Sequence, residues 1–135
     1  MTVFLDHHIL PTHDKIKSAE FYARIFGVPF DAKDARRFAR VDLSETMSFD
    51  FDNTEEEIPY RHYAFLVSDQ EFDQILDRVK AEGLKYGSDH FPDTRVDMQV
   101  GTNRVGRGFY FDDPNGYSLE VITQTYQGRG SPTTA

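Results

Sequence analysis

The chain contains an internal repeat, and this repeat limits the folds open to it. Three pairs of residues recur at an offset of 55 or 56 positions: His7 and His62, Asp14 and Asp69, and Gly27 and Gly83. Each half therefore predicts the same order of a strand that carries a histidine, a polar helix cap, an amphipathic helix and a terminating glycine. A chain of 135 residues has room for two such halves around a shared core.

Each half carries one amphipathic helix pattern. Between Asp14 and Gly27, apolar side chains recur at helical spacing: Ile16, Ala19, Phe21, Tyr22, Ile25 and Phe26. In the second half, Ser68 and Glu71 have the three-residue spacing of a capping box, and Gly83 is a natural end for the helix that follows them.

Strand patterns surround both helices. The predicted strands of the first half are Val3–Pro11, Pro29–Asp31, Phe38–Leu43 and Met47–Asp52, and those of the second half are Tyr60–Val67, Leu84–Gly87, Gly108–Asp112 and Ser118–Thr123. Each half thus predicts a βαβββ unit. Such a unit leaves its sheet half covered, so we expect the two halves to pack together. The long polar segment Ser88–Val105 predicts a loop with a functional role.

Composition excludes several classes of function. The chain has 15 Lys and Arg residues against 23 Asp and Glu residues, and this acidic balance disfavours nucleic acid and anionic membranes. No apolar run approaches the roughly 20 residues of a membrane span, and the amino terminus lacks the pattern of a signal peptide. The absence of cysteine excludes disulfides and thiolate metal ligands. We therefore expect a cytoplasmic protein that acts on a small molecule.

Strand alternation places four metal-ligating side chains on faces that do not pack against the helices: His7, Asp50, His62 and Glu120. Two buried carboxylates repel each other unless a proton or a cation lies between them. Two imidazoles and one or two carboxylates, without thiolate, suit Fe(II), Mn(II), Ni(II) or Zn(II). Ordinary roles as surface or hydrogen-bonded strand residues stay open for all four groups.

Three stretches carry a resemblance to a known family: LDHHILPTHDKIKSAEFY, RHYAFLVSDQEFDQILDRVKAEGL and GRGFYFDDPNGYSLEVIT. They resemble the signature stretches of the vicinal-oxygen-chelate superfamily, which includes glyoxalase I, extradiol dioxygenases, fosfomycin-resistance enzymes and bleomycin-resistance proteins. The resemblance extends from about Val3 to Thr123. It implies an α+β fold of two paired βαβββ modules, at about residues 3–53 and 60–124, in an open cup-shaped sheet with the helices outside. This is a single domain over residues 1–126, with residues 127–135 as a flexible tail.

The resemblance also implies a metal site. It assigns His7 rather than His8 as the first ligand, His62 as the second and Glu120 as the last. Asp50 takes the place of the carboxylate that glyoxalase-like members carry in the first module. Because Asp is one methylene shorter than Glu, three roles stay open for Asp50: contact with the metal through water, action as a base, or neither.

The implied reaction begins with a substrate that offers two neighbouring oxygens to the metal. In a glyoxalase-like isomerisation, Glu120 or Asp50 would be the catalytic base. In an extradiol cleavage, a histidine or tyrosine such as His90 would manage protons. The predicted substrate-binding residues are Tyr63, Asn103, Arg107 and Tyr110, whereas a solvated loop position is the favoured interpretation of Arg95.

Two functions from different classes stay open. The first is a metal-dependent lyase, isomerase or dioxygenase acting on a small oxygenated substrate. Glutathione-type glyoxalase I and fosfomycin-type transferase activity are disfavoured, because Asp50 departs from the first pattern and no monovalent-cation loop is evident for the second. The alternative is a metal-free protein that sequesters an aromatic antibiotic, as bleomycin-resistance proteins do, although such members typically lack the metal ligands. The resemblance further predicts a homodimer.

Overall fold

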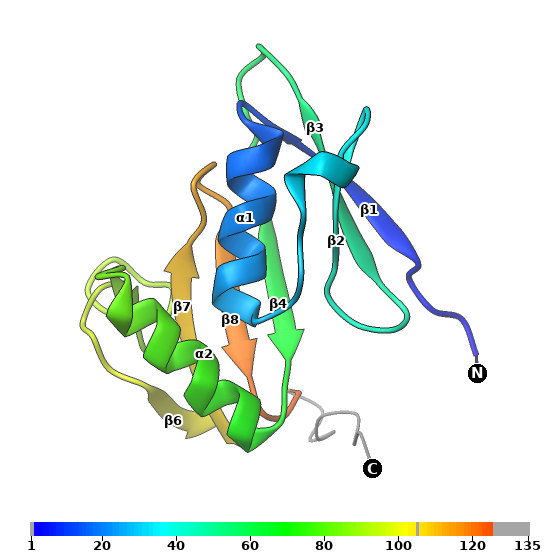
Figure 1. Ribbon diagram of the computed structural model, residues 1–135. Helices are drawn as coiled ribbons and strands as arrows, with labels where there is room; N and C mark the ends of the chain where they lie inside the picture. Colours follow the sequence, from blue (N-terminus) through cyan, green and yellow to red (C-terminus); the bar gives the residue numbers. More distant parts are fainter. Residues whose placement is uncertain (1, 105, 126–135) are drawn as a thin grey trace. The chain divides into compact units, whose positions relative to one another are not determined.

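The computed structural model describes residues 2–104 and 106–125, and it divides between Pro59 and Tyr60 into two compact units. Each unit combines one long helix with one open sheet (Figure 1). The α+β class and the paired modules predicted from the repeat are confirmed. That the two modules form a single domain stays a prediction, and the predicted tail lies outside the described residues.

Unit 1 is built from three strands and a helix. Its elements are β1 (His7–Thr12), α1 (Lys15–Phe26), a short 3-10 helix (Ala32–Asp34), β2 (Ala39–Asp42) and β3 (Ser48–Asn53). The strand order is β1-β3-β2, with β1 parallel and β2 antiparallel to the central β3. The crossover through α1 is what allows β1 and β3 to run parallel.

Unit 2 repeats this plan with a larger sheet. Its elements are β4 (His62–Leu66), α2 (Asp69–Ala81), β5 (Tyr86–Gly87), β6 (Gly101–Arg104), β7 (Gly106–Asp112) and β8 (Ser118–Ile122). The strand order is β4-β8-β7-β5, and β6 also pairs with β7. As in unit 1, the first strand of the unit runs parallel to the last, here β4 beside β8.

Local chemistry explains the bounds of α1. The Asp14 side chain accepts a hydrogen bond from the Lys17 backbone N–H, which satisfies one of the unpaired donors of the first turn. Gly27 ends the helix at φ 70°, a left-handed conformation that glycine adopts without steric cost. Between these caps, Tyr22 is fully buried and packs its ring against Phe49 and Phe51 of β3.

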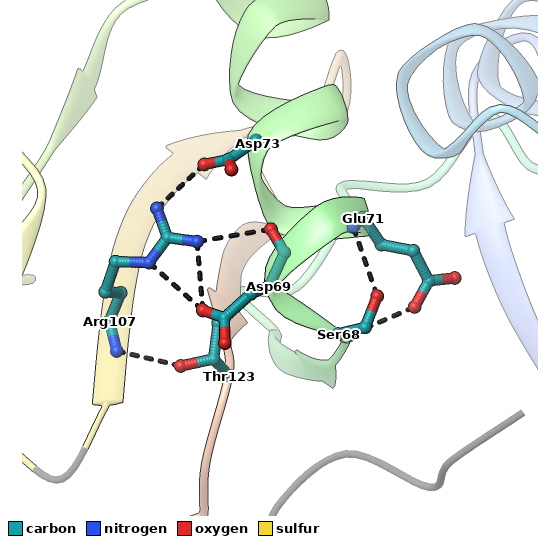
Figure 2. Close-up of polar contacts among 6 residues, drawn as sticks. All are labelled: Ser68, Asp69, Glu71, Asp73, Arg107 and Thr123. Atoms are coloured by element: carbon teal, nitrogen blue, oxygen red, sulfur yellow. Dashed lines mark hydrogen bonds and ion pairs between the residues drawn. The ribbon is translucent and has the colours of Figure 1, made fainter. Parts of the chain in front are cut away.

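α2 begins with the predicted capping box, since Ser68 and Glu71 each accept a hydrogen bond from the other's backbone N–H (Figure 2). The buried Phe72 packs edge-on against Phe109 of β7. One face of the unit 2 sheet is therefore covered by α2, as Figure 1 also shows. Among the described residues, neither helix is long and apolar enough to cross a membrane.

Two predicted strands and one predicted loop need correction. Pro29–Asp31 is not a strand, because Asp31 instead caps the 3-10 helix by accepting a hydrogen bond from the Lys33 backbone N–H. The first strand begins at His7 rather than at Val3. The segment Ser88–Val105, predicted to be entirely loop, contains the strand β6.

Candidate metal and substrate site

The sheet of unit 2 has a second face, on the side away from α2. His62, Ser118, Glu120 and Tyr110 share this face, because cross-strand partners project to the same side of a sheet. The register pairs His62 with Ser118 across β4 and β8, and it pairs Tyr110 with Glu120 across β7 and β8. The structure thus brings together two of the predicted metal ligands and one predicted substrate contact.

His62 and Glu120 are in direct contact. Nε2 of His62 lies 3.0 Å from Oε1 of Glu120, whose side chain is only 5% exposed, and Nδ1 lies 3.3 Å from the Ser118 hydroxyl. Both Nε2 and Oε1 offer lone pairs, so either a proton or a cation must lie between them. Two ligand atoms about 2.1 Å from an ion and at right angles to each other are themselves about 3.0 Å apart. The pair therefore fits two adjacent positions on a divalent metal.

Aromatic rings support this pair. Tyr110 is 7% exposed and stacks on the His62 ring with a centroid separation of 6.0 Å and an interplanar angle of 20°. His90 also contacts Tyr110, with its ring centroid 5.9 Å from that of Tyr110. Asp89 accepts from Nδ1 of His90 at 2.9 Å. Packing on Tyr110 restricts rotation of the His62 ring and so orients its Nε2 atom.

Hydrogen bonds between Ser88 and Asp97 hold the two ends of the loop that carries His90. Ser88 donates its hydroxyl and its backbone N–H to the Asp97 carboxylate, and these bonds lower the pKa of Asp97. The backbone at Thr94 and Arg95 lies so close to Gly87 that a β-carbon there would overlap it. Arg95, which the sequence predicts to be a solvated loop charge, forms an ion pair with Asp112.

The open face of unit 1 carries the other predicted ligand. His7 lies opposite Ser48 of β3, while the neighbouring His8 projects to the helix-covered face and contacts Phe49 edge-on. The Asp6 carboxylate lies 2.7 Å from Nδ1 of His7. A carboxylate at one ring nitrogen orients the other toward a metal, as in many metal sites. The choice of His7 over His8 thus agrees with the strand geometry.

Asp50 has a different partner from the one the repeat suggests. It is 5% exposed and accepts from Nε and Nη2 of Arg40, at 3.2 and 3.4 Å, and from the Ser48 hydroxyl at 3.1 Å. These contacts raise the pKa of Arg40, mainly through the hydrogen bond to Asp50. Both carboxylate oxygens are engaged by the guanidinium, so Asp50 does not contact a histidine as Glu120 does.

The remaining predicted substrate residues lie elsewhere. Arg107 projects toward α2, where its guanidinium donates to Asp69 and Asp73 (Figure 2). The guanidinium also lies over the Phe72 ring at 4.3 Å. Tyr63 alternates with His62 along β4 and packs edge-on against Tyr117. Asn103 belongs to β6, but its side chain lies outside the described residues. A substrate contact by any of these three stays a prediction.

Among the described residues, no group of three or more His, Asp or Glu side chains lies close enough together to hold a metal ion. Unit 2 supplies a histidine and a carboxylate, and unit 1 supplies a second histidine on an equivalent open face. A third ligand for the His62–Glu120 pair therefore stays a prediction.

Comparison with known proteins identifies the family. The model of the Glyoxalase/Bleomycin resistance protein/Dioxygenase superfamily matches residues 4–121. The chain belongs to this superfamily. The resemblance stated from the three sequence stretches is thereby confirmed.

Members with assigned names include transferases and an oxidase. The chain is 27% identical to the metallothiol transferase FosB of Lysinibacillus sphaericus (strain C3-41), over 93% of this chain and 85% of the relative. It is also 27% identical to the glutathione transferase FosA of Serratia marcescens, over 87% and 78%. Among solved structures, the oxidase ChaP-H2 is 40% identical, with a TM-score of 0.84 over 96% of this chain and 100% of that one.

Sequence reasoning missed Arg40, Ser48 and Ser118 as site residues. Alternation within Phe38–Leu43 places Arg40 on the other face of the strand from the apolar Ala39 and Val41, so the face that Arg40 occupies could be predicted from the sequence. Its pairing with Asp50 depends on the register between two strands, and residue pattern alone does not fix that register.

Proposed function

We propose that this chain is a metal-dependent enzyme that binds a small substrate through two neighbouring oxygen atoms, with His7, His62 and Glu120 as the metal ligands. The observation that carries the proposal is the 3.0 Å contact between His62 Nε2 and the buried Glu120 carboxylate on an open sheet face. Its named relatives are two transferases and an oxidase, which supports an enzyme over a sequestering protein.

Within this proposal, His7, His62 and Glu120 would hold an Fe(II), Mn(II), Ni(II) or Zn(II) ion, which would supply Lewis-acid chemistry to the two substrate oxygens. Ser118 and Tyr110 hold the His62 ring with Nε2 toward Glu120. Asp6 holds Nδ1 of His7 and leaves Nε2 for the metal. The His90 imidazole, which contacts Tyr110, is an additional group able to take up a proton.

An oxidation is the reaction type that we favour. The relative named as an oxidase is 40% identical over nearly the whole chain, compared with 27% for the two transferases. Thiol transfer is the second candidate, supported by the FosB and FosA relatives. Isomerase or lyase activity of the glyoxalase type, the cytoplasmic location and the homodimer stay predictions.

The test compares reactions on purified protein reconstituted with each of the four divalent ions. Dioxygen uptake is followed with a panel of catechols and α-hydroxyketones, and thiol loss is followed with fosfomycin as the acceptor. We expect metal-dependent dioxygen uptake that is lost in His62→Ala and kept in His13→Ala, because His13 bonds only to the Glu56 carbonyl among the contacts described. Thiol loss without dioxygen uptake would instead establish the transferase candidate.

A further inference from the structure

Arg40 lies on the open face of unit 1 and is held there by a buried carboxylate. Its cross-strand partner is Asp50, and the guanidinium donates to both Asp50 oxygens. The Asp50 side chain is 5% exposed, whereas the Arg40 side chain is 61% exposed. The Ser48 hydroxyl adds a third hydrogen bond to the carboxylate. Asp50 is therefore a buried anchor whose two carboxylate oxygens both accept hydrogen bonds, while Arg40, the residue it holds, faces solvent.

The guanidinium presents its far end outward. Nε and Nη2 lie on the side that faces Asp50, so the fork between Nη1 and Nη2 points away from the anchor. A cavity of about 540 Å³ is lined by Arg40, Ser48 and Asp6, and a second of about 430 Å³ is also lined by Arg40. Volumes of this size are typical of small-ligand sites.

This cavity adjoins the proposed metal ligand of unit 1. Asp6, which lines it, is the residue that holds Nδ1 of His7. Ser48, also in the lining, is the cross-strand partner of His7. A substrate bound at a metal on His7 would therefore extend along the same face toward Arg40.

We propose that Arg40 is a specificity-determining residue that binds an anionic group of the substrate, such as a carboxylate, in addition to the oxygen pair that chelates the metal. Asp50 is the positioning residue that holds Arg40 for this contact. The inference rests on the proposed function, because it needs the metal at His7. It narrows the substrate class to acidic compounds with two neighbouring oxygens.

The recognition is short-range and directional. Asp6, Asp42 and Glu45 line the larger cavity together with Arg40, so its carboxylates outnumber its single cation and the cavity as a whole is acidic. An arginine fork still forms two parallel charge-assisted hydrogen bonds with a carboxylate. The expected signature is therefore a preference between two ligands of the same shape, rather than a general attraction for anions.

The experiment measures this preference on zinc-loaded full-length protein, because zinc has no redox chemistry. Calorimetry compares 3,4-dihydroxybenzoate with 3,4-dihydroxybenzamide, which has the same shape without the charge, and 2,3-dihydroxybenzoate with its amide. We expect the wild-type protein to prefer at least one acid, and Arg40→Gln to reduce that preference by about tenfold. Asp50→Asn should reduce it less, since the arginine charge remains, and Arg40→Lys should retain part of it.

Arg37→Gln is the matched control. Arg37 also pairs with an aspartate of β3, Asp52, but its side chain is 77% exposed and its partner is 28% exposed. Removing it deletes a neighbouring charge without a buried anchor, so the preference should persist. Circular dichroism of each variant confirms that the fold is intact.

The two proposals fail in different ways. If neither the acids nor the amides bind zinc-loaded wild-type protein more tightly than zinc-free protein, the proposed metal function is overturned, and this inference falls with it. If they bind in a zinc-dependent manner but Arg40→Gln leaves every acid-to-amide ratio unchanged, the metal function stands and the role of Arg40 is refuted.

Discussion

The two units place the same three residue types on matching strands and use them differently. Each has a histidine at the start of its first strand, opposite a serine of the parallel strand, and a carboxylate two residues beyond that serine: His7, Ser48 and Asp50 in unit 1, and His62, Ser118 and Glu120 in unit 2. In unit 2 the carboxylate contacts the histidine, whereas in unit 1 it contacts Arg40.

The cross-strand neighbour explains this difference. Tyr110 lies beside Glu120, and Arg40 lies beside Asp50. A tyrosine ring stacks on the histidine and brings no charge that competes for the carboxylate, while a guanidinium engages both carboxylate oxygens. The shorter aspartate also reaches less far along the sheet. Equivalent backbone positions therefore do not guarantee equivalent chemistry.

The largest expected effect is a difference in metal affinity between variants of the two carboxylates, Glu120 and Asp50. Glu120→Ala should lower the affinity for divalent metal by about a hundredfold or more, since it removes a proposed ligand, while Asp50→Ala should change it by less than about threefold. Competition titration with a chromophoric chelator measures both. As controls, His8→Ala and His13→Ala should bind metal normally. Equal losses from both carboxylate variants would mean that the units are equivalent after all.

The two units carry an arginine at matching strand positions: Arg107 in β7 and Arg37 just before β2. Arg107 donates to two α2 aspartates and lies over Phe72, so Arg107→Ala should destabilise the protein by about 2 kcal/mol. Arg37→Ala should cost less than about 0.5 kcal/mol, because its ion pair is exposed. Urea unfolding measures both values, and a ranking in the opposite order would disprove the stabilising contact of Arg107 with α2.

The helix caps provide a smaller test. Ser68→Ala removes one half of a reciprocal capping box and should cost about 1 kcal/mol, as should Asp14→Ala at the single-bond cap of α1. We expect Ser68→Ala to be the more costly of the two, because Glu71 also loses the geometry of its bond to the cap. Thermal unfolding of both variants at neutral pH decides the order.

The smallest effect is on pH dependence. Burial raises the pKa of Tyr117, the residue before Ser118, to about 12, whereas unit 1 has Met47 at the matching place. A raised pKa in the folded state favours the protonated form, so its contribution to stability is complete below about pH 10 and declines as pH rises toward 12. Urea unfolding between pH 8 and pH 12 should show a shallower alkaline decline for Tyr117→Phe. Identical declines would remove Tyr117 as the cause.

Much of the fold followed from local chemistry in the sequence. The caps at Asp14 and Ser68, the glycine at position 27 and the apolar stripes of both helices act within one or two turns, and the structure confirms them. The error at Pro29–Asp31 has a local cause as well, since Asp31 satisfies a backbone N–H within a helical turn instead of leaving it for a sheet.

The site was less accessible from the sequence. Alternation placed His62 and Glu120 on one face, but their contact depends on the parallel register of β4 and β8. The contact between Arg40 and Asp50 likewise depends on the register of β2 and β3, which the sequence pattern alone does not fix. By contrast, the position of Arg107 could be predicted, because Arg107 shares one face of β7 with Phe109 and Phe111, whose rings lie on the helix-covered side.

We propose that His62 and Glu120 form part of a metal site. The decisive experiment is elemental analysis of purified, untagged protein, with wild type beside His62→Ala. We expect a near-stoichiometric amount of iron, manganese, nickel or zinc in the wild type and its loss in the variant. A wild-type protein that holds no metal even after divalent ions are added back would contradict it and would favour the metal-free binding protein.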